Sequence, residues 1–336
     1  MSLTSELKSR AREVGFHLVG VTSPEPFDAA QTEMERWLAH GHNAEMAWLN
    51  AARAQLSTHP RDLLADARSL VVVGVSYRTE EPAQAPGGRV ARYAWGGDYH
   101  AAMKSRLKEL AAWLGGRSRV FVDDGPLVER DAAIRAGLGF RGKNTNVLTP
   151  IGSFVFLGAV LSDVELDFDQ PVQKDCGSCR LCIDACPTNA LDDAYHLQAE
   201  RCIAYLTIEH RGSVSDELRP LVGDWVFGCD ICQEVCPYNA STRNRPRGWP
   251  EFEPRSGTRL DLIELLQTDE TAFRERFHGS PIKRTKRRGL VRNAALALGN
   301  LGDASSRAHL ERLVAENPDP VVGEAAGWAL RQLPLS

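Results

Sequence analysis

The sequence predicts a multidomain α+β protein with an α/β N-terminal region, a cysteine-rich middle region and an α-helical C-terminal region. Helical stretches alternate with short apolar runs in the first part, all eight cysteines lie within residues 176–236, and the C-terminal residues repeat apolar positions at helical spacing. We therefore expect domains at 1–170, 171–242 and 281–336, with residues 243–280 as a connector.

The composition is that of an ordinary globular protein. Of the 336 residues, 43% are hydrophobic and 25% are charged, and the formal net charge is −4, which is close to the average for folded domains. An overall excess of positive charge is therefore excluded as a basis for binding nucleic acid. A nucleic-acid partner would have to meet a local basic patch.

The N-terminus predicts an amphipathic helix rather than an export signal. Leu3, Leu7, Ala11 and Val14 recur at helical spacing among charged residues. The sequence shows neither the apolar core of a signal peptide nor an apolar run of about 18 residues that could span a membrane. We expect a cytoplasmic protein, in which thiols remain reduced.

Short apolar runs predict a largely buried sheet in the N-terminal region. They lie at 70–75, 120–122 and 154–157 and are rich in β-branched residues.

The C-terminal region instead predicts three helices with turns at 300–303 and 317–320. Their apolar positions are Leu290, Ala294, Ala297 and Leu298; Leu310, Leu313 and Val314; and Val322, Ala325, Ala326, Ala329 and Leu330. Paired helices of this length are typical of a HEAT-like repeat.

The cysteines form two runs with iron–sulfur spacing. The first follows the ferredoxin pattern, in which three thiolates bind one cubane and the fourth binds the other; it comprises Cys176, Cys179, Cys182, Cys186 and Pro187. The second has the same ending and comprises Cys229, Cys232, Cys236 and Pro237. This second run lacks one ligand, and Cys202 is the cysteine that remains.

Exchange of the fourth ligand divides the cysteines into two sets, each predicted to hold one [4Fe–4S] cluster in a ferredoxin-like domain. The first set is Cys176, Cys179, Cys182 and Cys236, and the second set is Cys186, Cys202, Cys229 and Cys232. Two zinc sites or a disulfide framework are the alternatives. Zinc sites do not require two Cys-Pro endings, and disulfides do not suit a reducing compartment.

A glycine-rich stretch at 137–144 matches nucleotide-binding patterns only in part. It satisfies G-x-G-x-x-G, and Asn144 stands where a phosphate loop needs Ser or Thr. Both patterns require a strand before the glycines and a helix after them, whereas residues 127–136 have a helical pattern. We expect Gly137 to terminate that helix, and a nucleotide site is the alternative.

His100 follows Asp98 and Tyr99 in a polar, aromatic stretch. This stretch is similar to the start of the D-x-H-x-x-G motif of some corrinoid proteins, but Met103 occupies the glycine position. We therefore expect a hydrogen-bonded structural histidine.

Asp123 and Asp124 follow an apolar run and precede Gly125 and Pro126. One interpretation is that they only form a turn. The other is that Asp123, at the end of a buried strand, is partly buried, has a raised pKa and donates a proton.

Five segments together resemble the epoxyqueuosine reductases, which complete queuosine at the wobble position of certain tRNAs. They occur in the family's order and cover most of the chain: residues 92–100, 122–127, 136–145, 202–210 and the double cysteine motif that ends at 236–239. The sequence departs from the family at Asp124, where Thr or Ser is frequent, and at Phe140 and Arg141, where a Trp-containing pair is frequent.

The resemblance implies a cobalamin against the N-terminal region, near one cluster, and makes Asp123 the proton donor. The residues that it places at the cobalamin are Tyr99, His100, Asp123, Arg130, Lys143, Asn144, Val147, Leu157 and Val160. It further implies reduction of epoxyqueuosine in tRNA with electrons passed through the clusters to cobalamin. The electrons would come from an external low-potential donor such as ferredoxin or flavodoxin, and we expect a monomer.

Positive charge is concentrated between 281 and 292, where six basic residues and no acidic one occur. From 243 to 292 there are 13 Lys or Arg and 7 Asp or Glu. Such a segment on a helical scaffold suits a folded RNA, and the predicted tRNA contacts are Lys283, Arg284, Arg287, Arg288 and Arg292. A solvated basic face or an acidic protein partner is the alternative.

Two other functions remain open from the sequence. A corrinoid reductive dehalogenase would combine similar clusters and cobalamin with a small halogenated substrate, but such enzymes usually carry an export signal. A ferredoxin-like electron carrier would leave the N-terminal region without a task, since that region is larger than electron transfer alone requires.

Overall fold

Four antiparallel strands form the sheet that the sequence predicts. The computed structural model describes residues 2–80, 86–240 and 245–334. The strand order is β1-β2-β7-β4, with bounds Leu18–Thr22, Ser69–Ser76, Val155–Ser162 and Ser118–Phe121. Every neighbouring pair is antiparallel. Helices and strands alternate along the chain as expected, but the sheet lacks the parallel pairing of β-α-β units, so this region is α+β rather than α/β.

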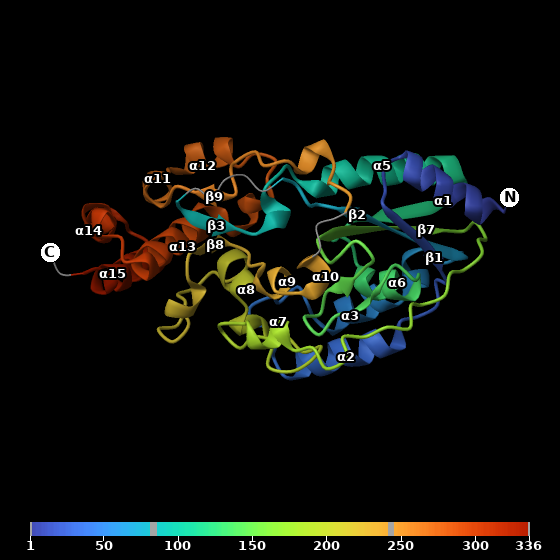
Figure 1. The fold of residues 1–336 in the computed structure, drawn as a ribbon, viewed down its shortest axis with the longest axis horizontal. Coiled ribbons are helices and arrows are strands. Elements are labelled where there is room, and N and C mark those ends of the chain that lie inside the picture. The colour runs from blue at the N-terminus through green and yellow to red at the C-terminus, as the bar shows by residue number, and fades with distance from the viewer. Residues whose placement is uncertain (1, 81–85, 241–244, 335–336) are drawn as a thin grey trace.

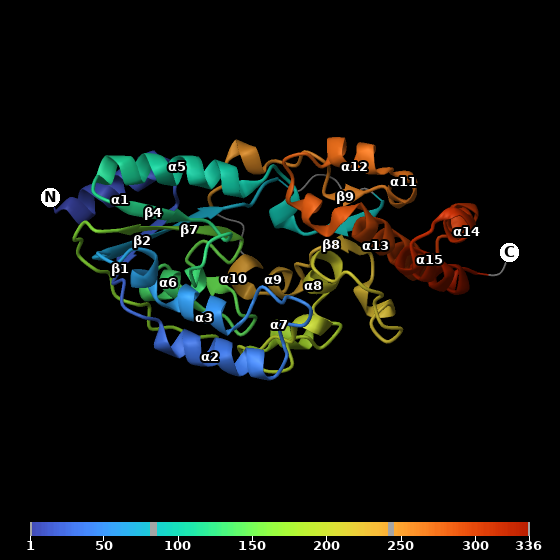
Figure 2. The same cartoon turned by 180° about the vertical axis from the view of Figure 1, so that it is seen from behind.

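Helices cover both faces of the sheet (Figures 1 and 2). Helix α1 (Leu3–Glu13) and helix α5 (Tyr99–Leu114) pack on one face, where Leu7, Met103 and Leu107 are buried. Helix α6 (Glu129–Arg135) packs on the other. The other helices on that side are α2 (Asp28–Ala39), α3 (Ala51–Thr58) and α4 (Pro60–Leu63). Alternate residues of β2 and β7 fill the two cores because strand side chains point to opposite faces.

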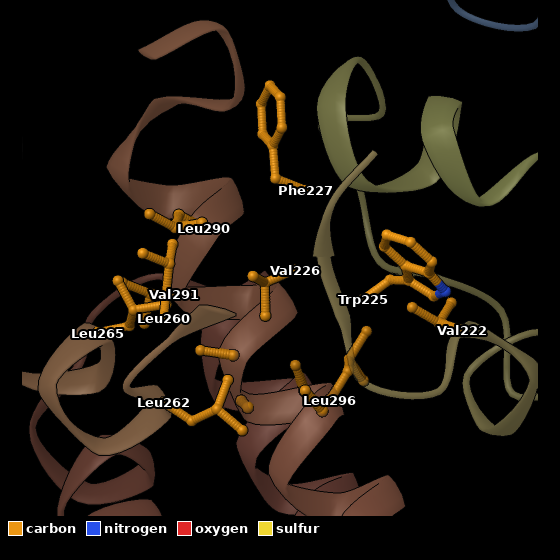
Figure 3. Close-up of a cluster of buried hydrophobic side chains, with 14 of the residues drawn as sticks. Val222, Trp225, Val226, Phe227, Leu260, Leu262, Leu265, Leu290, Val291 and Leu296 are labelled. Carbon is orange, nitrogen blue, oxygen red and sulfur yellow. The ribbon is translucent and has the colours of Figure 1, made fainter. Parts of the chain in front are cut away.

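A third core, separate from the two on the faces of the sheet, joins the region after β2 to the C-terminal part of the chain. Strand β3 (Gly88–Val90) pairs with β8 (Trp225–Phe227) and β9 (Arg259–Leu260). Figure 3 shows Trp225, Val226 and Phe227 of β8 beside apolar side chains of the C-terminal helices. The segment that leads to Tyr99 is thereby fixed between the sheet and the helical region.

Short helices carry most of the cysteine-rich region, which lies between the sheet and the C-terminal helices in Figure 1. They are α7 (Leu181–Asp184), α8 (Ile203–Ile208), α9 (Ile231–Glu234) and α10 (Pro237–Ala240), with 3₁₀ turns at Ala199–Arg201 and Pro220–Val222. The hairpin of β5 (Phe140–Arg141) and β6 (Val147–Leu148) lies against this region, since Phe140 and Leu148 pack on Cys236.

Three C-terminal helices form where the sequence predicts them: α13 (Lys286–Leu301), α14 (Arg307–Glu316) and α15 (Pro320–Gln332). They follow α11 (Leu262–Gln267), α12 (Glu270–Arg276) and the 3₁₀ turn Pro281–Thr285; other 3₁₀ turns are Arg92–Ala94, Pro250–Phe252 and Ala304–Ser306. Val314 is the exception to the predicted apolar positions, because its side chain is exposed. Helix α13 is buried on all sides from Gly289 to Gly299, which places it at the centre of the third core.

Residues 241–244, where the predicted connector begins, and residues 335–336 at the C-terminus lie outside the described residues.

Within the part of the chain that is described, no helix is both long and apolar enough to cross a membrane.

The glycine-rich stretch is not a nucleotide-binding loop. Gly137 lies two residues after the end of α6 and has a φ of +74°, which confirms its expected role as the residue that terminates the helix. A helix precedes the glycines, strand β5 lies between Gly139 and Gly142, and, in the described chain, no helix follows directly, whereas phosphate loops require a strand before the glycines and a helix after them.

Candidate active site

Asp123 lies at the tip of a tight turn directly after β4. The Asp124 N–H donates to the Val122 carbonyl oxygen at 2.5 Å, and Asp123 has a φ of +56°. Asp123 is thus the central residue of a γ-turn of the rare, strained form with positive φ. The turn projects from the strand, so Asp123 is exposed and not partly buried as the sequence led us to expect.

Tyr99 binds the Asp123 carboxylate. Its hydroxyl donates to Asp123 Oδ2 at 2.6 Å. The Tyr99 ring is buried and stacks on Phe156 and on His100, with centroids 4.0 and 4.1 Å apart. Burial raises the pKa of Tyr99, and the charge of Asp123 and the hydrogen bond raise it further. Tyr99 therefore remains a protonated donor that fixes one oxygen of Asp123.

His100 is the hydrogen-bonded residue that the sequence predicts. Its Nδ1 lies 2.6 Å from Asp98 Oδ1, and Asp98 also caps α5 by accepting from the His100 N–H at 3.0 Å. Burial lowers the pKa of His100, but the hydrogen bond and charge of Asp98 outweigh it, so the pKa lies above its usual value. The Asp98 pair accounts for the position of this ring without a metal.

Glu129 lies beneath the turn at the first position of α6. Its carboxylate oxygens accept from the Asp123 N–H at 2.8 and 2.9 Å. Burial raises the pKa of Glu129 to about 8, and the charge of Asp123 raises it as well. No sequence pattern singles out this residue, because its contact depends on the shape of the turn.

The basic C-terminal segment reaches the same place. Arg284 forms an ion pair with Glu209. The hydrogen bond from Arg284 to Glu209 raises the pKa of Arg284, burial opposes the rise, and the charges of Tyr93 and Asp123 add to it. The Asp98 N–H donates to the Gly279 carbonyl at 2.7 Å, so the chain enters the basic segment beside the start of α5, which carries Tyr99.

The other predicted tRNA contacts differ in exposure. Lys283 and Arg284 are exposed, and so is Lys286, which was not among the predicted contacts. Arg287 and Arg288 are partly buried, where Arg287 Nε donates to the Thr268 carbonyl at 2.6 Å and Arg288 Nε lies 2.5 Å from Asp319 Oδ2.

The prediction for Arg292 is wrong. Only 1% of this residue is exposed, and its guanidinium donates to the carbonyl oxygens of His210 and Gly212 at 2.9 and 2.7 Å. Arg292 follows the basic residues in sequence, but it lies on the buried face of α13. It holds the loop after α8 in place and cannot meet a phosphate.

The electrostatic coupling among the thiols is compatible with the two predicted sets, whose assignment stays a prediction. In the first set, burial raises the pKa of Cys236, and the charges of Cys176 and Cys179 raise it further. The pKa of Cys182 is raised by burial and by Cys176 and Cys236. These thiols therefore lie close together although Cys236 is distant in sequence.

The thiols of the second set also have raised pKa values. Burial raises the pKa of Cys229, and the charges of Cys202 and Cys186 add to the effect. The pKa of Cys232 is raised by burial and by Cys229 and Cys202, and also by Cys182 of the first set. Cys202, which completes this set by elimination in the sequence, is thus beside its predicted partners.

The donor set fits cubanes better than single ions. Among the described residues, no group of three or more His, Cys, Asp or Glu side chains could hold one metal ion. A zinc ion needs its sulfurs at about 2.3 Å, whereas the four thiolates of a cubane bind four different irons and stand further apart. The two Cys-Pro endings, at Cys186-Pro187 and Cys236-Pro237, remain the observation that favours cubanes over zinc.

Tyr93 connects the second set to the Asp123 turn. Burial raises the pKa of Tyr93, and the charges of Asp123 and Asp230 raise it further. Asp230 is itself buried beside Cys229, where it accepts from the Arg92 N–H at 2.6 Å. The Tyr93 ring lies 6.4 Å from the Tyr99 ring and 6.0 Å from the Phe227 ring between centroids, so it joins the residues beside Asp123 to the strand that ends two residues before Cys229.

Two predicted cobalamin contacts hold the cysteine loops instead. Lys143 Nζ donates to the carbonyl oxygens of Gly177 and Cys179 at 2.6 and 2.9 Å. Asn144 Nδ2 donates to the Cys232 carbonyl at 3.1 Å. Their side chains link the loop between β5 and β6 to both cysteine sets, and contact with a cobalamin stays a prediction.

The remaining predicted contacts divide by orientation. Arg130 is exposed and donates to the Thr145 carbonyl at 3.4 Å, which joins it to that loop. Val147 and Leu157 pack in one apolar cluster. Val160 is three residues beyond Leu157 and therefore points to the opposite face of β7, where it is 1% exposed in the core under α5. A contact through the Val160 side chain is excluded.

Comparisons with known proteins agree with this arrangement. Residues 175–239 match the family model of a 4Fe-4S double cluster binding domain, and residues 58–124 match that of epoxyqueuosine reductase QueG, DUF1730. An epoxyqueuosine reductase of Gloeobacter violaceus is 39% identical, over 91% of this chain and 98% of its own. That of Escherichia coli is 36% identical, over 98% of this chain and 89% of its own.

The chain belongs to the epoxyqueuosine reductase family. Two solved structures of the family each cover 98% of this chain and 90% of their own. One, an epoxyqueuosine reductase with an epoxyqueuosine-modified tRNA-Tyr stem loop, has 32% identity and a TM-score of 0.91. The other, from Bacillus subtilis, has its catalytic loop swung out of the active site, 31% identity and a TM-score of 0.90. Membership in this family decides against the dehalogenase and electron-carrier alternatives.

Proposed function

We propose that this protein reduces epoxyqueuosine in tRNA to queuosine at the wobble position, with Asp123 as the proton donor. The observation that carries the proposal is the exposed Asp123 carboxyl, held by Tyr99 at 2.6 Å, between two cysteine sets and a basic segment. A family member of similar fold was solved with an epoxyqueuosine-modified tRNA stem loop, which supports the same substrate here.

The cysteine sets would hold two [4Fe–4S] clusters, and cobalamin would bind beside Asp123, Tyr99 and Arg130. The fit is supported by the exposure of Asp123 and Arg130 and by the apolar pair of Val147 and Leu157. When bound, the clusters supply single electrons and the cobalamin supplies a strong reductant or nucleophile at cobalt.

Asp123 would deliver a proton to the epoxide oxygen. Removal of that oxygen to leave an alkene requires two electrons and two protons, and the oxygen leaves as water. A carboxylic acid beside the epoxide lowers the cost of the developing alkoxide charge. Tyr99 donates to Oδ2, which leaves Oδ1 to face the substrate.

The exposed basic residues would bind the phosphates of the tRNA. Lys283 and Arg284 lead from the 3₁₀ turn into α13, and this segment begins beside the start of α5, which carries Tyr99. Phosphate contacts there would position the RNA, and the wobble base would be splayed toward Asp123. Arg287 and Arg288 would contribute from their partly buried positions. The helices α13 to α15 would form the HEAT-like unit that supports this surface.

The remaining expectations form part of the same proposal. An external low-potential carrier such as ferredoxin or flavodoxin would reduce the clusters. The enzyme would act as a monomer, and its tRNA substrate would place it in the cytoplasm.

One experiment tests the proposal. Anaerobically purified protein is incubated with cobalamin, a low-potential reductant and epoxyqueuosine-containing tRNA, and the nucleosides are then analysed. Queuosine should form only when cobalamin is present, and the protein should be brown with about eight irons per chain. A colourless protein, or formation of queuosine without cobalamin, would contradict the proposal.

A further inference from the structure

The backbone of Asp123 is held from outside its turn by one carboxylate. Both oxygens of Glu129 accept the Asp123 N–H, at 2.8 and 2.9 Å. The turn itself closes through the Asp124 N–H and the Val122 carbonyl. The side chain of Asp124 pairs with Lys104, and that of Asp123 accepts from Tyr99. The contact with Glu129 is therefore the one that acts directly on the strained peptide.

That strain needs an explanation. An Asp residue with a φ of +56° is in the left-handed region that favours glycine, and a γ-turn of this hand is rare. Such conformations persist only when surrounding groups determine them, and they cluster at functional sites. If the turn relaxed to negative φ, the Asp123 N–H and side chain would both change direction, and the carboxyl would leave Tyr99.

Glu129 opposes this relaxation because it is anchored to a packed helix. It is the first residue of α6, and α6 packs against β2 and β7 of the sheet. The acceptor is therefore attached to a rigid element, while the donor belongs to a loop. The N···O distances of 2.8 and 2.9 Å are those of an ordinary N–H···O hydrogen bond, which a carboxyl oxygen accepts in either protonation state.

We propose that Glu129 is a positioning residue that holds Asp123 in its left-handed conformation, so that the carboxyl meets Tyr99 and faces the substrate. The proposal rests on the proposed function for its effect on turnover. Its effect on the turn can be measured without any turnover.

Hydrogen exchange measures the turn directly. In Glu129→Ala the amide of Asp123 loses its acceptor, so exchange in the peptide that covers residues 122–128 should be about tenfold faster than in the wild type. Glu129→Gln keeps one acceptor oxygen and should restore most of the protection. Asp131→Asn is the matched control, because Asp131 is on the same helix and pairs with Arg141; its exchange should equal that of the wild type.

A double-mutant cycle shows whether Glu129 acts through Asp123. Glu129→Ala should lower kcat by roughly 30- to 100-fold, with KM changed less than about twofold, because only the placement of the carboxyl is lost. In an Asp123→Asn background the same substitution should cost less than about twofold more. Iron content should be unchanged throughout.

Two results would overturn the proposal. One is unchanged exchange of the 122–128 peptide in Glu129→Ala. The other is full additivity of the two substitutions, which would mean that Glu129 supports something other than Asp123. If the wild type formed no queuosine, the proposed function would fail, but the exchange result would still decide whether Glu129 holds the turn.

Discussion

The Asp123 turn and the cysteine loops serve one reaction but are built in opposite ways. The cysteine loops contain eight equivalent side chains at fixed spacing. These side chains would act as ligands, and electron transfer would be carried out by the clusters that they hold. The turn presents a single exposed carboxyl on strained backbone, and its geometry depends on Tyr99 and Glu129. Cysteine ligands of a cluster can be identified from their spacing in the sequence. A carboxyl that donates a proton can be identified only from the residues that contact it in the structure.

The two regions are nevertheless joined by short contacts. Lys143 and Asn144 bind carbonyl groups of both cysteine sets, and Arg130 binds the same loop beside the turn. These contacts run through the β5–β6 loop, whereas the Asp123 turn is held by Tyr99 and Glu129, so we expect that each region can be disabled while the other stays intact. The following predictions test that separation.

The largest effect is expected from Cys232→Ser, which removes a ligand of the second set. Turnover should fall below detection, and iron should fall from about eight to about four per chain by the count of ligands. Exchange of the 122–128 peptide should not change. Ser178→Ala, in a loop of the first set, is the control and should keep its iron. A disturbed Asp123 turn in Cys232→Ser would show that the regions are not independent.

Sequence reasoning succeeded where function follows from spacing. The double-cluster region, the end of α6 at Gly137 and the three C-terminal helices follow from local pattern and agree with the family match or the structure. It failed where function depends on which way a side chain points. Arg292 and Val160 lie in segments of the right character, but helix and strand geometry turns both into the core. The exposure of Asp123 likewise depends on a turn whose positive φ no local motif required.

A smaller effect is expected on tRNA binding. Lys283→Ala combined with Lys286→Ala removes two exposed charges. Affinity at low salt should fall roughly tenfold, and the slope of log affinity against log salt should decrease by about 1.4 to 1.8. Iron content and peptide exchange should stay at wild-type values. Arg274→Ala, an exposed basic residue on α12 paired with Glu270, is the control. An unchanged salt slope in the double variant would exclude this surface.

The last effect concerns stability rather than function and is a change in its pH dependence. The Glu129 pKa is raised from 4.5 to about 8 in the folded protein, chiefly by burial and then by Asp123. Between these values unfolding releases a proton, so the contribution of Glu129 to stability is complete below the unfolded pKa and is lost as pH rises toward 8. Glu129→Gln removes this loss.

Thermal unfolding at pH 5 and pH 8 measures this difference. Relative to the wild type, Glu129→Gln should gain on the order of 2 kcal/mol between the two pH values, after allowance for the solvent that reaches this side chain. Asp131→Asn should show no such gain. Parallel pH profiles for Glu129→Gln and the wild type would mean that Glu129 is already ionised in the folded protein.

The most direct test of the account is a single-turnover measurement on Asp123→Asn loaded with iron and cobalamin, reduced beforehand and mixed with epoxyqueuosine-containing tRNA. Spectra of the reduced clusters, iron content and tRNA affinity should match the wild type, while queuosine forms about 10²- to 10⁴-fold more slowly. Formation of queuosine at the wild-type rate would contradict the assignment of Asp123 as the proton donor.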